Sequence, residues 1–202
     1  MEPIFGSTYF PGIVLQNVFN LAFCIWVFIE VAVLAVTAIR GRKSAQEKKK
    51  SDRSSMLLIA IGVFLAVLVN PFLILRFRFV LPLPLFWLGL AFMALGLFLR
   101  VYSVWILGNS FTPTVQVTSG QKIVQAGPYH YIRHPAYAGT MLGIFGISVA
   151  FRSPLAILAV LLILAAVYGY RIKIEEKALE EGFGAEYKEY ETHTWRLIPY
   201  VW

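Results

Sequence analysis

Two short segments of this 202-residue sequence contain most of the side chains that could do chemistry. The first, GPYHYIRHPAYAG at residues 127–139, places aromatic rings, imidazoles and an arginine among apolar neighbours. In the second, Arg171 and Glu175 are spaced i, i+4 and so share one face of a helix, with Glu176 about 100° further round. A buried or enclosed set of this kind can hold a charged molecule.

The second segment continues into an acidic cluster at Glu180 and Glu181. Such a cluster is typical of a solvated helix end. Carboxylates near the C-terminal end of a helix oppose its dipole, however, so positive groups are expected close by. Arg171, Lys173 and Lys177 can supply the positive charge, and a bound cationic ligand is the alternative.

The first segment also has a purely structural interpretation. Tyr, His and Arg form interfacial belts at membrane surfaces, and Pro135 suits the first position of a helix. His130 and His134 have the spacing of helical metal ligands, but Pro135 disfavours one helix through both, and no third His or Cys is nearby. We therefore expect no metal site here.

The elements that must position these residues are set by a composition typical of an integral membrane protein. Hydrophobic residues make up 58% of the chain and charged residues 14%, and the mean hydropathy is +0.69. The net charge of +7 comes from loops between apolar runs, which favours an orientation signal beside lipid headgroups over nucleic-acid binding. The single Cys24 excludes an intrachain disulfide.

Five apolar runs predict an all-α membrane protein with about five transmembrane helices. The first three runs reach the ~20 residues needed to cross a bilayer, whereas the fourth is short and is predicted to form a tight helical hairpin with the fifth. The runs cover residues 13–39, 56–75, 84–107, 136–150 and 154–174.

The predicted hairpin has its own sequence signals. Ser153 suits an N-cap and Pro154 the first helical position, while Gly182 and Gly184 predict the end of the last helix. Small residues of the fourth run are spaced so that two membrane helices can approach closely, which we expect to tighten the hairpin. These residues are Gly139, Gly143 and Gly146.

The charge pattern predicts an orientation. The first apolar run is too long for a signal sequence, and residues 1–12 contain no Lys or Arg, so we expect it to remain as an anchor. The loop at residues 40–53 carries seven Lys or Arg against two acids, which places it in the cytoplasm and the N-terminus outside. Residues 108–135, the C-terminus and the active site then face the cytoplasm.

Two charged residues fall inside predicted membrane helices. Glu30 and Arg100 lie at similar depths toward the cytoplasmic side, and intramembrane charges usually have a partner in the bundle interior. We expect them to pair, with snorkelling of Arg100 to the interface as the alternative.

The two chemical segments together resemble the isoprenylcysteine carboxyl methyltransferase family of integral membrane enzymes. The resemblance covers roughly residues 110–202. An RHPxYxG segment together with an REE-type segment, here Arg171 followed by Glu175 and Glu176, is more specific than either segment alone. The compact chain looks like a prokaryotic-type member. The matching residues are Gly127, Tyr129, Arg133–Gly139, Arg171, Glu175, Glu176, Leu179, Phe183, Gly184, Tyr187, Tyr190, Ile198 and Pro199.

The resemblance implies methyl transfer from S-adenosylmethionine to the carboxylate of a lipid-linked, prenylated acceptor, either a small molecule or a peptide. Glu175 corresponds to the acid that meets the amino group of the cofactor, and Glu176 would add to its field. Arg171 corresponds to the arginine that receives the acceptor carboxylate. The other positions that would enclose the cofactor are Gln116, the strand-like Gln121, Lys122, Ile123 and Val124, then Tyr129, His134, Pro135 and Tyr137.

Residues 1–110 are then expected to supply three membrane helices, and 111–202 the cofactor-binding and catalytic region, in one membrane domain. A phospholipid or other lipid amine N-methyltransferase is the alternative, although Arg171 has the wrong sign for an amine acceptor. An NADPH-dependent membrane reductase would need a nicotinamide site and a longer chain. A non-catalytic scaffold would leave Glu30 and Arg100 unexplained.

Overall fold

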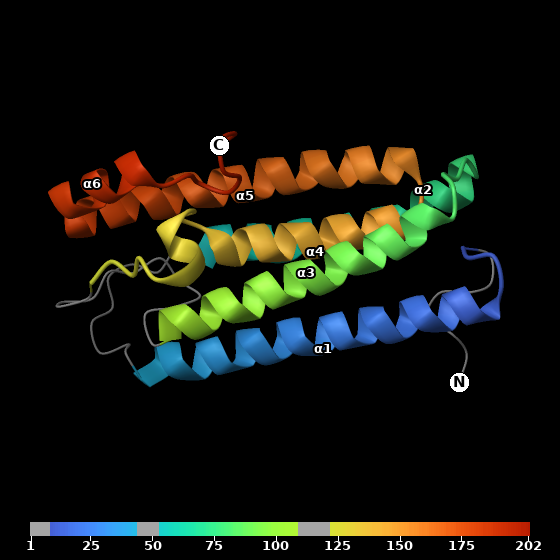
Figure 1. Cartoon of the computed structure of the whole chain (residues 1–202), viewed down its shortest axis with the longest axis horizontal. Coiled ribbons are helices and arrows are strands. Elements are labelled where there is room, and N and C mark those ends of the chain that lie inside the picture. Colours follow the sequence, from blue (N-terminus) through green and yellow to red (C-terminus); the bar gives the residue numbers. More distant parts are fainter. Residues whose placement is uncertain (1–8, 44–52, 109–121) are drawn as a thin grey trace.

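The protein is a bundle of long helices that run along its longest axis. The computed structural model describes residues 9–43, 53–108 and 122–202. Figure 1 shows α1, α3, α4 and α5 side by side, with the hinge before α4 (residues 127–134), the short α6 and the C-terminal segment (residues 194–202) gathered at one end. The helices are α1 (Ile13–Lys43), α2 (Arg53–Phe77), α3 (Pro84–Leu107), α4 (Pro135–Phe151), α5 (Pro154–Phe183) and α6 (Ala185–His193), with a 3-10 turn η2 (Gly127–His130).

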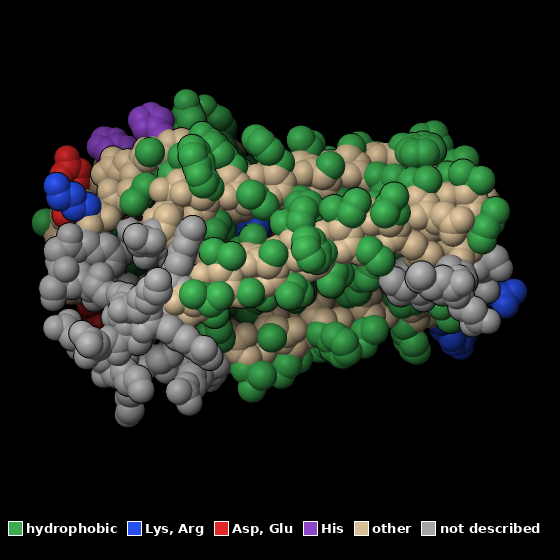
Figure 2. Space-filling model, turned by 90° about the horizontal axis from the view of Figure 1, so that it is seen from below, with side chains coloured by type: hydrophobic (Ala, Val, Ile, Leu, Met, Phe, Trp, Pro, Cys, Tyr) green, Lys and Arg blue, Asp and Glu red, His purple; other side chains and the backbone are tan. Residues whose placement is uncertain are grey.

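The prediction of an all-α membrane protein is confirmed. Among the described residues, four helices, α1, α2, α3 and α5, are long and apolar enough to cross a membrane, while α4 has 17 residues. Hydrophobic side chains cover the middle of the face in Figure 2; Lys and Arg side chains lie at both ends, and acidic and histidine side chains at one of them. This distribution is that of a multi-pass membrane protein.

The short helix α4 lies in the middle of the bundle. Twelve of its 17 residues are buried, and it packs against α2, α3 and α5. A helix that is apolar on every side is either buried in a protein core or spans a membrane, and the burial of α4 by its neighbours favours the first. Because its neighbours shield α4 from lipid, it does not need the length of a lipid-exposed span.

The glycines of α4 serve a different contact from the one expected. α4 is joined to α5 in a hairpin through Arg152 and Ser153, but its most extensive packing is with α3. A Cβ atom on Gly139 would lie 2.7 Å from the Gly96 carbonyl oxygen of α3, and one on Gly146 would lie 2.7 Å from that of Gly89. Gly139 and Gly146 thus bring α4 against α3, whereas a Cβ on Gly143 would lie 2.6 Å from Trp26 Nε1 of α1. The prediction that these glycines tighten the α4–α5 hairpin is therefore wrong.

The ends of α5 follow the predicted signals. The Ser153 side chain accepts a hydrogen bond from the Ala156 amide at 3.4 Å, and Pro154 takes the first helical position. α5 continues well beyond the apolar run and ends at Phe183, after which Gly184 adopts a φ of +58° that favours glycine. This extension carries Arg171, Glu175 and Glu176 past the apolar part of the helix.

The predicted pairing of Glu30 and Arg100 is confirmed. Arg100 Nε lies 3.4 Å from Glu30 Oε2, and both side chains are largely buried between α1 and α3. Thr140 of α4 donates to Glu30 Oε1 at 3.3 Å, and Arg100 Nη1 donates to the Ala136 carbonyl at 3.4 Å. The ion pair therefore ties α1 and α3 to the first turns of α4.

We predict that Gly96→Ala lowers the free energy of unfolding by about 3 kcal/mol, because the added methyl meets the α4 backbone at Gly139 and Gly143 and forces α3 and α4 apart. Gly169→Ala is the matched control, since its Cβ would meet only the Trp202 ring, at 3.9 Å. Unfolding of the two variants in detergent, followed by tryptophan fluorescence, measures the difference. Equal stability of both would contradict the close α3–α4 contact.

We also predict that Glu30→Gln and Arg100→Gln each destabilise the protein by about 3 kcal/mol or more, because each leaves a buried charge without its partner. The double variant removes both charges and should regain part of that loss. Denaturation of the four proteins in detergent gives the coupling. A double variant that recovers none of the loss would show that the pair contributes no coupling energy.

Candidate active site

Arg171 lies at the centre of a buried polar cluster at the hinge end of the bundle. It comes from α5, and its side chain is 3% exposed. Its Nε donates to the Tyr137 hydroxyl of α4 at 3.1 Å, and its Nη1 donates to the Ser55 hydroxyl of α2. Three helices thus meet at one guanidinium, which is fixed at two of its nitrogens.

The Tyr137 hydroxyl joins Arg171 to Glu175. It accepts from Arg171 and donates to Glu175 Oε2 at 2.5 Å, while Arg171 Nε lies 3.7 Å from the same carboxylate oxygen. The Glu175 side chain is 25% exposed, in contrast to the buried arginine. A carboxylate accessible to a cation therefore lies beside a guanidinium that can receive an anion.

Aromatic rings form the walls of this cluster. The His134 and Tyr137 rings are stacked, with centroids 5.6 Å apart, and the Tyr168 ring lies 5.3 Å from that of Tyr137. Tyr129 is buried, and its backbone carbonyl accepts from the Tyr190 hydroxyl at 2.6 Å. Flat faces of this kind suit the adenine and ribose of a nucleoside.

The Tyr129 hydroxyl is buried and has no hydrogen-bond partner within the described part of the chain. Burial, reinforced by the negative charge of Glu175, raises the pKa of this phenol well above its usual value. It therefore stays neutral at physiological pH and can donate to a ligand. A buried donor close to an accessible carboxylate fits a cofactor with polar groups and a positive charge.

Glu176 faces a different set of partners. Its carboxylate, 5% exposed, accepts from Arg133 Nε at 3.0 Å and from Arg196 Nε at 2.8 Å, and His134 Nε2 lies 3.5 Å away. Arg133 also donates to the Thr194 carbonyl at 2.5 Å. These contacts satisfy the Glu176 carboxylate with the protein's own cations, so it links the hinge, α5 and the C-terminal segment.

Backbone hydrogen bonds reinforce the same link. Ile132 and Trp195 form a parallel bridge, and the Arg133 and His134 amides donate to the Trp195 and Arg196 carbonyls at 2.7 and 3.0 Å. The C-terminal segment therefore runs beside the hinge that carries His134 toward Tyr137.

The structure brings together six of the predicted site residues, and the others lie apart or outside the described residues. No hydrogen bond or ion pair in the described ranges joins Lys122, Ile123 or Val124 to the cluster, and these three residues lie in a segment without regular secondary structure rather than in a strand. Gln116 and Gln121 lie outside the described residues. Pro135 is buried at the first position of α4, as predicted. The six are Tyr129, His134, Tyr137, Arg171, Glu175 and Glu176.

Sequence reasoning missed three residues of this end of the bundle. Arg133 and Arg196 hold Glu176, and the need for a cation beside a buried carboxylate was the signal that could have identified them. Ser55 reaches Arg171 from 116 positions away, and nothing in its local sequence predicts that contact.

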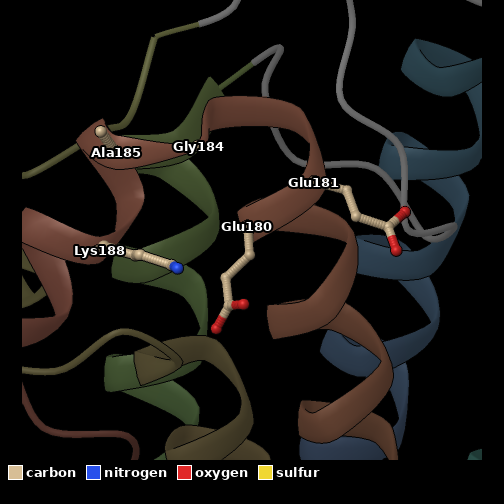
Figure 3. A pocket seen from close by; sticks show the side chains of 5 residues that line it. All are labelled: Glu180, Glu181, Gly184, Ala185 and Lys188. Carbon is tan, nitrogen blue, oxygen red and sulfur yellow. The ribbon is translucent and has the colours of Figure 1, made fainter.

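A shallow hollow lies further along α5, where the chain turns into α6. Figure 3 shows the Glu180 and Lys188 side chains directed toward the same space, with Glu181 pointing away. Gly184 and Ala185 complete its lining. None of the residues around Arg171 lines this hollow, so it is separate from the cluster.

Comparison with known proteins agrees with this geometry. The sequence profile described as phospholipid methyltransferase matches residues 84–186, just over half of the chain. The chain is 31% identical over 117 residues to a probable protein-S-isoprenylcysteine O-methyltransferase of Oryza sativa subsp. indica, covering 57% of this chain and 61% of the relative. It is 32% identical over 116 residues to protein-S-isoprenylcysteine O-methyltransferase of Saccharomyces cerevisiae, covering 56% and 48%.

The aligned region thus spans about half to three-fifths of these curated relatives. A solved structure of a eukaryotic intramembrane Ras methyltransferase, isoprenylcysteine carboxyl methyltransferase, superposes with a TM-score of 0.69 at 21% identity, over 96% of this chain and 70% of that one. The chain therefore belongs to the phospholipid methyltransferase family, and it has the fold of isoprenylcysteine carboxyl methyltransferase.

Proposed function

We propose that the protein transfers a methyl group from S-adenosylmethionine to the carboxylate of an isoprenylcysteine or a similar lipid-linked acceptor, giving a methyl ester. The observation that carries this proposal is the contact of Arg171 and Glu175 through one tyrosine hydroxyl. A receptor for an anion and a receptor for a cation lie side by side, as a reaction between a carboxylate and a cationic methyl donor requires. The names of the relatives support the same reaction.

The cofactor would be held on the Glu175 side of the cluster. When bound, S-adenosylmethionine supplies a methyl group on a positively charged sulfur. The accessible Glu175 carboxylate suits its amino group, and the Tyr129 hydroxyl and the His134 and Tyr137 rings suit the nucleoside. Pro135 and residues 116 and 121–124 stay in this proposal as flanking cofactor contacts.

Glu176 has a different role in this proposal from the one first expected. Its carboxylate is already surrounded by Arg133, Arg196 and His134, and so it contributes little field to a cationic cofactor. We assign it to positioning: it holds the hinge against α5, which keeps His134 and Tyr137 facing Glu175.

The acceptor carboxylate would bind Arg171. A guanidinium presents its donors in a planar fork that matches a carboxylate. A carboxylate is ionised at neutral pH and can take a methyl group without losing a proton, so the site needs no general base. An amine acceptor, as in a lipid N-methyltransferase, would meet the positive charge of Arg171 instead.

The site would face the cytoplasm. It lies at the end of the bundle where α1 and α3 finish and α2 and α4 begin. In the sequence the basic residues 40–53 stand between the apolar parts of α1 and α2, and the positive-inside rule assigns such a stretch to the cytoplasm. The lipid part of the acceptor would reach the site from the bilayer between helices, and its polar head and the cofactor from the cytoplasm.

We predict that membranes containing the protein transfer label from methyl-labelled S-adenosylmethionine to a prenylcysteine analogue, and that alkali releases the label as volatile methanol. Arg171→Ala should reduce this product by about 100-fold, because the acceptor loses its charged receptor, while cofactor binding persists. Lys173→Ala removes the same charge from an exposed position of α5 and serves as the control. Label that resists alkali would indicate N-methylation and contradict the ester.

We further predict different losses for the two neighbouring acids. Glu175→Gln should abolish measurable S-adenosylmethionine binding in titration calorimetry, because this accessible carboxylate loses the charge that would meet the cofactor amino group. Glu176→Gln should lower the free energy of unfolding by about 3 kcal/mol, because the buried Arg133 then keeps only its longer, 3.9 Å contact with the Glu191 carboxylate. The exposed Glu181→Gln is the control for both. Full-strength cofactor binding by Glu175→Gln would overturn the assignment of this residue.

A further inference from the structure

Ser55 reaches the candidate acceptor site from a part of the chain that lies outside the family match. It stands in the first turns of α2, is fully buried, and accepts a hydrogen bond from Arg171 Nη1. The family match begins at residue 84, so α1 and α2 are not part of it. A residue of the N-terminal half therefore contacts the group that would receive the acceptor.

The approach of α2 to α5 is built into the sequence. Gly62 lies seven residues after Ser55, on the same face of α2, and a Cβ atom there would come within 2.5 Å of Val167 Cγ2 on α5. The absence of a side chain at Gly62 lets the two helices pack closely. That packing brings the Ser55 hydroxyl within hydrogen-bonding reach of Arg171, which is four residues after Val167 on the same face of α5.

Hydroxyls from two other helices hold the Arg171 guanidinium. The Tyr137 hydroxyl of α4 accepts from Nε at 3.1 Å. The Ser55 hydroxyl holds Nη1 from a second helix and so sets the orientation of the plane. Both anchors are neutral hydroxyls, so neither adds a negative charge to the one that Glu175 already places 3.7 Å from Arg171 Nε.

We propose that Ser55 is a positioning residue that sets the affinity for the acceptor carboxylate through Arg171. This inference rests on the proposed function, in which Arg171 receives that carboxylate. Ser55 acts through the arginine and does not itself touch the acceptor or the cofactor. Its loss should therefore weaken carboxylate recognition and leave cofactor binding unchanged.

The test compares a prenylcysteine analogue bearing a free carboxylate with its carboxamide, using the full-length protein in lipid nanodiscs. In Ser55→Ala the KM for the carboxylate should rise about tenfold, and kcat should fall less than twofold. The inhibition constant of the carboxamide and the Kd for S-adenosylmethionine should stay unchanged. Ser55→Cys keeps a side chain at this position but replaces the hydroxyl with a poor acceptor, and it should behave like Ser55→Ala. Ser148→Ala, a buried serine bonded only to the Ile144 carbonyl among its described contacts, is the control and should match wild type.

A double-variant cycle separates positioning from general packing. In an Arg171→Ala background, Ser55→Ala should cause no further loss of carboxylate affinity. Three results would each overturn the role of Ser55. The KM for the carboxylate could be unchanged in Ser55→Ala, or the affinity for the carboxamide could fall as much as that for the carboxylate. In the Arg171→Ala background, Ser55→Ala could still cause its full loss of carboxylate affinity. Two results must be kept apart. If the wild-type protein does not prefer the carboxylate over the carboxamide, the proposed function itself fails. If the wild-type protein shows this preference and Ser55→Ala keeps it in full, only the role of Ser55 fails.

Discussion

The Glu176 carboxylate is the interaction on which the rest of the site depends. It lies between Arg133 of the hinge, Arg196 of the C-terminal segment and His134, and it is almost completely removed from solvent. A buried carboxylate is stable only where cations and hydrogen bonds compensate for the lost hydration. That requirement determines where the hinge lies on α5, and hence which rings face Glu175.

A second constraint acts inside the membrane, where helices gain little from excluding water and must pack closely instead. The glycines of α3 and α4 allow backbone contact along the whole of α4, and the Glu30–Arg100 pair joins α1 to the same core. α4 is therefore held from several sides near its first turn. Tyr137 lies in that turn, so this packing also fixes the position of Tyr137.

Much of the fold could be predicted from the sequence, because apolar runs, Ser153-Pro154 and Gly184 are local signals that a bilayer makes strong. The pairing of Glu30 and Arg100 was also predictable, since an intramembrane charge needs a partner. The helix that the α4 glycines contact was not predictable. Their spacing shows that one face of α4 carries small residues, but it does not show which helix packs on that face. The contact of Ser55 with Arg171 depends on the α2–α5 packing and has no local signature.

The C-terminal segment has a consequence for how the protein is made. Trp195 pairs with Ile132, Arg196 reaches Glu176, and Trp202 packs near Gly169. These residues follow α1 to α5 in the sequence, so the contacts that hold the hinge at Glu176 can form only after those five helices have been synthesised. The last residues to be made therefore complete the polar end of a bundle whose apolar helices are made first.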